Sequence, residues 1–186
     1  MILFRKLLTG ILILTVPYML LAFPETAGSN NKRALIGIEL FPSFLASDKN
    51  IHEKKRKDGS LTVVVAYLYN PKIANDMAYR LNSLGKIREI PIHVISVSVE
   101  EFEDTINQTI GGIYIAEPGA ITQQIIKESI NNHFIVFSPY EGDVEKGATG
   151  GIYITEKIVP YLNMTTLNAA KIRMKSFFLR VSKKYE

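Results

Sequence analysis

Short apolar runs alternate with amphipathic stretches along most of the chain. Four of the runs are rich in β-branched and aromatic residues, which is typical of strands buried on both faces: residues 61–69, 90–99, 111–118 and 134–139. The stretches between them carry apolar residues at helical spacing. Because strands that alternate with helices pair in parallel through right-handed crossovers, we predict an α/β fold, an open and mostly parallel twisted sheet with helices on both faces. Its central strands should follow the order second, first, third, fourth.

The apolar positions also indicate which face of each helix meets the sheet. The predicted inward-facing residues are Leu35, Ile38, Phe41 (or Leu40) and Leu45 in the first helix, Ile73, Met77, Leu81 and Leu84 in the second, and Ile121, Ile125 (or Ile126) and Ile130 in the helix of residues 120–133. Asn30 or Asn31 is suited to cap the first helix, and Pro42 should bend or break it. Asn70 and Pro71 are typical of the start of the second helix.

The alternation changes after the fourth strand. Residues 150–157 and 159–164 predict two more strands in an antiparallel hairpin, which makes about six strands, and a capped helix then closes the chain. The sequence GGIYIAE of residues 111–117 returns as GGIYITE in residues 150–156. We interpret each Gly-Gly pair as a tight backbone turn at the start of a strand, with an internal duplication as the alternative.

The first 24 residues have the layout of an export signal. Arg5 and Lys6 precede residues 7–24, which carry no charge and end near the small residue Ala22. An uncleaved membrane anchor is the alternative, because about 18–20 apolar residues can span a bilayer. We therefore expect a signal or anchor at 1–24, a polar linker at 25–31 and a single domain at 32–186. That domain should lie outside the inner membrane, which is the periplasm if the cell is Gram-negative.

The charge distribution argues against a nucleic-acid-binding protein. The 22 Lys and Arg residues exceed the 18 Asp and Glu residues by 4, and two of the cations lie in the predicted signal. Of the rest, seven lie between Lys157 and Glu186 with one acidic residue, whereas residues 23–156 are mildly acidic. A protein that binds nucleic acid through a uniformly basic surface would not show this distribution. The chain also contains no Cys, which excludes disulfides and a thiolate nucleophile.

Candidate catalytic chemistry is sparse. None of the common nucleophile, phosphate-binding or metal-ligand spacings occurs, so we expect a protein that is not an enzyme, with no metal and no cofactor. The best polar cluster is Glu141, Asp143 and Glu145 in the loop after the fourth strand. Ligands favour the carboxyl ends of parallel strands, and Glu117 ends the neighbouring strand, so these four acids are the predicted ligand-binding residues. They could bind an amine or Ca²⁺, and a plain solvated turn is the alternative.

Four aromatic residues near the two ends of the domain are the predicted partner-binding residues: Phe41, Phe44, Phe177 and Phe178. The two aromatic helices could instead pack together beside the sheet. The cationic final helix could also lie on an anionic membrane surface, or dock its apolar stripe on the domain and leave its cations in water. The basic run Lys54–Lys57 is interpreted as a solvated loop, with an anion-binding patch as the alternative.

Several segments together resemble the YfiR-like family of bacterial periplasmic proteins. They are the exported N-terminus, KRALIGIELFPSFLASD, the strand LTVVVAYLY, the Gly-Gly strand at 150–154 and LNMTTLNAAKIRMKSFFLRV. The last segment is similar to the closing pattern of the family, with Asn163, Ala169 and Ala170 roughly in place. The chain departs from the family in lacking a Trp-Pro pair after the first helix and structural cysteines.

The resemblance implies a regulator without catalysis. A member of the family restrains an inner-membrane diguanylate cyclase by binding its periplasmic sensor domain, which lowers cyclic-di-GMP signalling and biofilm formation. By resemblance, the expected partner is an inner-membrane signalling protein such as a diguanylate cyclase periplasmic domain. A homodimer of this chain is the other association that the sequence leaves open. The alternative is a small periplasmic solute-binding protein with its pocket at the strand carboxyl ends, between residues 117–122 and 139–150.

Overall fold

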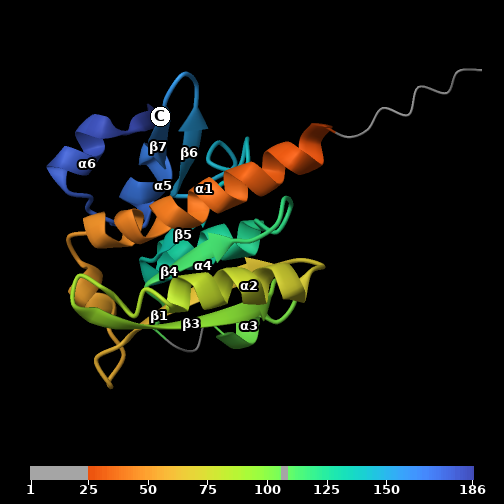
Figure 1. Ribbon diagram of the computed structural model, residues 1–186. Coiled ribbons are helices and arrows are strands. Elements are labelled where there is room, and N and C mark those ends of the chain that lie inside the picture. The colour runs from red at the N-terminus through yellow and green to blue at the C-terminus, as the bar shows by residue number, and fades with distance from the viewer. Residues whose placement is uncertain (1–24, 106–108) are drawn as a thin grey trace, which may run out of the picture.

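The computed structural model describes residues 25–105 and 109–186, and the predicted signal or anchor at 1–24 lies outside this part. One eight-stranded sheet has the order β2-β3-β1-β4-β5-β6-β7-β8 (Figure 1). The strands are β1 (Leu61–Tyr67), β2 (Lys86–Ile87), β3 (Ile90–Ser98), β4 (Gly112–Ile115), β5 (Ile135–Ser138), β6 (Gly150–Ile154), β7 (Ile158–Asn163) and β8 (Lys183–Tyr185). The helices are α1 (Glu25–Ser47), α2 (Pro71–Asn82), α3 (Phe102–Thr105), α4 (Gln123–Asn132), α5 (Met164–Ala169) and α6 (Ser176–Val181), with a 3₁₀ turn η1 (Ile51–Lys54).

The predicted α/β architecture is confirmed. Strands β3, β1, β4, β5 and β6 pair in parallel, in the central order expected, and β6 and β7 form the antiparallel hairpin. Two short edge strands were not predicted: β2 pairs antiparallel with β3, and β8 pairs in parallel with β7. With two and three residues they are too short to show an alternating pattern.

Helix α1 begins earlier and runs straighter than the sequence indicates. It is continuous from Glu25, so residues 25–31 are helical instead of a linker and neither Asn30 nor Asn31 caps it. Pro42 lies inside it without ending it. The missing N–H of Pro42 costs one hydrogen bond, but Phe41 and Phe44 on either side are completely buried against the sheet and hold the helix in place. Leu35 is half exposed, contrary to its predicted inward position.

The repeated Gly-Gly strands make room for α1 instead of forming turns. A Cβ atom on Gly112 would lie 2.5 Å from the Leu45 side chain, and one on Gly150 would collide with the ring of Phe44. Both glycines therefore let this helix approach β4 and β6 closely, and neither has a positive φ angle. The interpretation as tight turns was wrong.

Helix α2 packs through small residues. Its N-terminal cap is as predicted, with the Asn70 side chain accepting a hydrogen bond from the Ile73 amide. Ala74, Ala78 and Leu81 are buried against β1 and β3, whereas the Ile73 side chain is partly exposed and Leu84, beyond the helix, is half exposed. Of the predicted stripe, Leu81 is buried and Met77 packs partly buried against the core, whereas Ile73 and Leu84 do not face inward. Two alanines, which allow close helix-to-sheet packing, complete the contact face.

Two apolar layers flank the sheet. On one face, side chains of α1, α2, α5 and α6 pack against those of β1, β4, β5, β6 and β7. On the other face, Phe102 of α3 and Ile125 of α4 pack against the opposite side of the central strands. In Figure 1, α1 and α2 lie in front of the sheet and α4 behind it. This arrangement leaves the two ends of the strands as the open edges of the molecule.

Candidate functional site

A cavity of about 120 Å³ opens at the carboxyl ends of β5 and β6. We call it the carboxyl-edge cavity. Its walls come from α1, from the β5–β6 loop and from the β6–β7 hairpin, and its polar and aromatic lining is Arg33, Tyr140, Glu141, Glu145, Tyr153 and Tyr161. Val144, Ile152 and Ile154 supply apolar surface. The sheet thus presents a mixed polar and apolar hollow at the edge where parallel α/β sheets bind ligands.

Arg33 places a cation in this cavity. Its Nε donates a hydrogen bond to the Pro139 carbonyl oxygen at 2.7 Å, and Nη2 donates to the Ile152 carbonyl oxygen at 3.2 Å. These two bonds join α1 to the ends of β5 and β6. They fix the direction of the guanidinium without neutralising it, since both acceptors are uncharged.

The opposite wall combines aromatic rings with a carboxylate. Tyr153 and Tyr161 lie side by side, with ring centroids 5.4 Å apart. The Tyr161 hydroxyl donates a hydrogen bond to Glu145 Oε1 at 2.9 Å. Burial of the hydroxyl and the nearby Glu145 carboxylate raise the pKa of Tyr161 to about 12. Tyr161 therefore stays protonated at neutral pH, and the second oxygen of Glu145 is left available for a ligand.

Asp143 lies beneath the cavity and organises the loop. It is almost completely buried, accepts a hydrogen bond from Ser138 Oγ at 2.6 Å and pairs with Lys146 at 3.1 Å. Tyr140 donates its hydroxyl hydrogen to the Ala116 carbonyl oxygen, and burial raises the pKa of Tyr140 well above its usual value. These contacts set the shape of the loop, so Asp143 supports the site without facing a ligand.

Glu117 does not line the carboxyl-edge cavity. Its carboxylate accepts hydrogen bonds from the amides of Tyr69 and Asn70, the latter at 2.7 Å, and so holds the start of α2. Of the four predicted ligand-binding acids, the structure brings Glu141 and Glu145 to the cavity. The cavity also lies between the β5–β6 loop and the hairpin, not between residues 117–122 and 139–150 as expected.

Sequence reasoning missed four polar or aromatic lining residues, Arg33, Tyr140, Tyr153 and Tyr161. Tyr153 and Tyr161 occupy facing strands of the predicted hairpin, and that pairing was the available signal. For Arg33 the sequence contained no such signal, because its hydrogen-bond partners lie more than a hundred residues away along the chain.

Three of the four predicted partner-binding aromatics are core residues. Phe41, Phe44 and Phe178 are 0%, 1% and 3% exposed, whereas Phe177 is 52% exposed. The rings of Phe44 and Phe178 lie 4.9 Å apart in an edge-to-face contact, so the two aromatic helices do pack together. Phe41, Phe44 and Phe178 are therefore unavailable to a partner.

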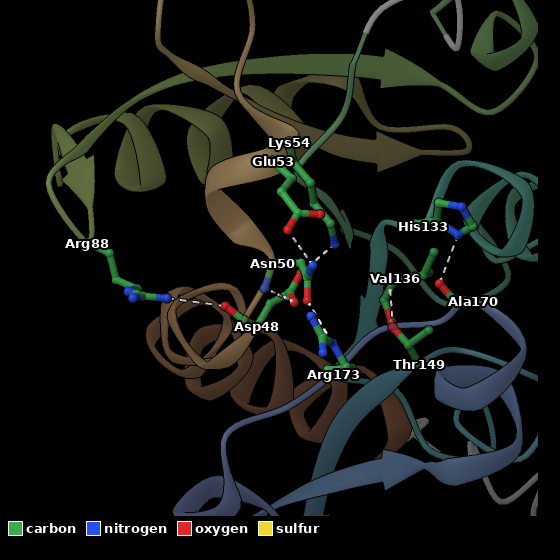
Figure 2. A network of polar contacts seen from close by, with 10 residues as sticks. All are labelled: Asp48, Asn50, Glu53, Lys54, Arg88, His133, Val136, Thr149, Ala170 and Arg173. Atoms are coloured by element: carbon green, nitrogen blue, oxygen red, sulfur yellow. Dashed lines mark hydrogen bonds and ion pairs between the residues drawn. The ribbon is translucent and has the colours of Figure 1, made fainter.

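A second hollow, of about 340 Å³, lies at the amino ends of the strands, and half of the residues in the polar network of Figure 2 line it: Asp48, Asn50, Glu53, Lys54 and His133. Lys54 is nearly buried and pairs with Asp48 at 2.5 Å, so the first residue of the predicted solvated basic run is a structural cation. Asn50 receives a hydrogen bond from Arg173 Nε at 3.1 Å, and His133 Nδ1 contacts the Ala170 carbonyl oxygen at 3.0 Å. Because these groups satisfy one another across separate segments, the network ties the closing segment to the end of α1.

Within residues 25–105 and 109–186, no three His, Asp or Glu side chains are arranged to hold a metal ion. In the same ranges, no helix has the length and apolar character needed to cross a membrane.

No protein-family model and no curated protein sequence matches the chain. Several solved structures have a similar fold, including the following two. One is the ABC domain in complex with L-Trp from Streptococcus pneumonia, with a TM-score of 0.55 and 10% sequence identity over 82% of this chain and 60% of that one. The other is the ligand-free, open structure of CD0873, a substrate binding protein with adhesive properties from Clostridium difficile, with a TM-score of 0.54 and 16% identity over 81% of this chain and 58% of that one.

The likeness is one of fold. At 10% and 16% identity it supports the α/β architecture, and this chain spans less than two thirds of the length of either protein.

Proposed function

We propose that the chain is a non-catalytic binding protein, acting outside the inner membrane, that holds a small solute in the carboxyl-edge cavity. The observation that carries this proposal is the convergence of Arg33, Glu145 and the Tyr153–Tyr161 ring pair on one hollow. The fold similarity to a domain in complex with L-Trp and to a substrate binding protein supports the solute-binding role over a regulatory one.

The lining favours a ligand that carries an amine. Two carboxylates, Glu141 and Glu145, face one guanidinium, so the cavity has a net negative charge. Tyrosine rings stabilise a cation over their faces. Arg33 can pair with a carboxylate on the same ligand, which makes an amino acid the best fit among common solutes.

The proposal predicts a selective thermal shift. Amino acids and simple amines should raise the melting temperature of the purified protein, because a ligand that binds only the folded state stabilises it by about 2.7 kcal/mol at 100 times its Kd. Neutral sugars should not. Glu145→Gln should weaken binding about tenfold or more, since a charge-assisted hydrogen bond contributes roughly 1.5–3 kcal/mol.

Glu39→Gln is the matched control, because Glu39 is an exposed carboxylate on α1 outside the cavity. It should bind like the parent protein. Equal shifts for sugars and amines, or equal affinity of the E145Q and parent proteins, would contradict the proposed site.

A regulator of a membrane-bound signalling protein is the second candidate function. It rests on the YfiR-like resemblance and on a shallow apolar groove between α1 and α2, where Leu35, Ile73 and Leu84 are partly exposed beside Arg80. The partner proposed by resemblance is a diguanylate cyclase.

Deletion of the gene should then raise cellular cyclic-di-GMP, and Leu84→Asp should reproduce part of the rise by placing a charge on the groove. Unchanged cyclic-di-GMP in the deletion strain would exclude the cyclase version. Glu145→Gln separates the two candidates, because it should affect solute binding and leave the cyclic-di-GMP level as in the parent strain.

A further inference from the structure

The outer face of α6 combines apolar and cationic side chains. The exposed positions of this helix are Ser176, Phe177, Arg180 and Val181, which recur at the spacing of one helical face. Phe177 is 52% exposed and Val181 is 55% exposed. The opposite side carries Phe178, which is buried in the core, and Leu179, which is packed against it. The helix is thus docked by one face and leaves an amphipathic face in water.

More cations continue this face on both sides of the helix. Lys175 precedes α6, and Lys184 follows it in β8, in register with the core residue Leu162. Lys183 points to the other face of the sheet, where it lies over the Tyr153 ring. We call Lys175, Phe177, Arg180, Val181 and Lys184 the tail face. In Figure 1 it lies at one end of the sheet, with α6 and the C-terminus together.

The tail face is held rigidly. The Lys175 amide donates a hydrogen bond to the Ser47 carbonyl oxygen at the end of α1. Ser182 Oγ donates to the Phe178 carbonyl oxygen at 2.6 Å, and β8 pairs in register with β7. The backbone that carries the exposed ring and the cations is therefore already ordered, so binding does not require this segment to fold.

We infer that the tail face binds the surface of an anionic lipid membrane. The cations match the negative surface charge of such a membrane, and Phe177 and Val181 are the kind of apolar side chains that enter the headgroup boundary beside basic residues. Three cations, Lys175, Arg180 and Lys184, beside the two exposed apolar side chains of the same face suit a continuous anionic surface. This binding is separate from the carboxyl-edge cavity, and holds whether or not a solute binds there.

The absence of Trp from the chain gives a direct test. Phe177→Trp in the full chain introduces a single tryptophan at a half-exposed position, where the larger ring fits without disturbing the core. Its fluorescence should shift to shorter wavelength with vesicles of mixed phosphatidylglycerol and phosphatidylcholine, and stay unshifted with phosphatidylcholine alone. This readout reports the tail face itself, even if residues 1–24 insert into both kinds of vesicle.

Two experiments test whether the cations of the tail face contribute to membrane binding: their replacement by neutral residues and an increase in salt concentration. Adding Arg180→Gln and Lys184→Gln to F177W should lower the membrane-bound fraction of the tail face about tenfold, because each cation near an anionic surface contributes to binding. Raising the salt concentration to about 1 M, where the Debye length falls to roughly 3 Å, should reverse the shift.

Tyr79→Trp is the matched control, since Tyr79 is 78% exposed on α2, away from the tail face. It should show no shift with either vesicle. The inference is overturned if F177W is unshifted by anionic vesicles, as expected for a surface that binds an acidic protein instead. An equal shift with neutral vesicles, or an equal shift of Trp at position 79, would overturn it as well. Unchanged urea midpoints of the variants verify that they remain folded.

Discussion

Replacing Phe44 by Ala is expected to lower the free energy of unfolding by about 3–5 kcal/mol, the usual cost of removing a buried phenylalanine ring. Phe44 is 1% exposed, and its ring contacts those of Phe137 and Phe178 at centroid distances of 4.8 and 4.9 Å. It also fills the space left by the missing side chain of Gly150. The substitution therefore leaves a cavity where α1, α6 and the sheet meet. Urea unfolding followed by circular dichroism measures the loss.

Phe177→Ala is the matched control for this prediction. Phe177 belongs to the adjacent aromatic pair but is 52% exposed, so its loss should change the free energy of unfolding by no more than about 0.5 kcal/mol, as at other surface positions. Equal destabilisation by the two substitutions would show that the core does not depend on the contact between α1 and α6.

Removal of the Asp48 carboxylate is expected to destabilise the protein by about 3–5 kcal/mol, because it leaves the Lys54 ammonium nearly buried without a partner. The two side chains are 1% and 9% exposed and lie 2.5 Å apart. Asp48 also accepts a hydrogen bond from the Asn50 amide at 2.9 Å, which Asp48→Ala leaves unsatisfied. Urea unfolding of D48A against the parent protein measures the effect.

Two further variants distinguish a buried pair from an ordinary surface pair. Adding Lys54→Met to D48A should recover most of the lost stability, since the uncompensated charge is then gone. Asp76→Ala breaks the Lys72–Asp76 pair, whose side chains are 85% and 64% exposed, and should cost less than about 1 kcal/mol. A D48A cost as small as that of D76A would contradict a structural role for the buried pair.

Most of the architecture followed from local patterns. The β-branched runs of residues 61–69 and 134–139 are strands because they are buried on both faces, and the order β3-β1-β4-β5 follows from the right-handed crossover rule. The Asn70 cap before Pro71 was also predictable, because capping depends on neighbouring residues alone.

The position of each side chain within the helices was less predictable. Leu35 and Ile73 have helical spacing but face solvent, whereas Ala74 and Ala78 face the sheet. Hydrophobic periodicity favours large apolar residues, yet close packing of a helix on a sheet selects small ones. In the same way, the GGIYI repeat was visible in the sequence, but only the packing of Phe44 and Leu45 explains its glycines.

In the candidate site, too, some features follow from the sequence and others only from the tertiary structure. The sequence by itself determined that Glu141 and Glu145 follow a strand of a parallel sheet, which places them at the edge where ligands bind. Only the tertiary structure decided that Arg33 and Tyr161 complete the cavity, that Asp143 is buried beneath it and that Glu117 holds α2. The physical reason is that local hydrogen bonding and side-chain alternation determine helices and strands, whereas a cavity depends on contacts between segments more than a hundred residues apart.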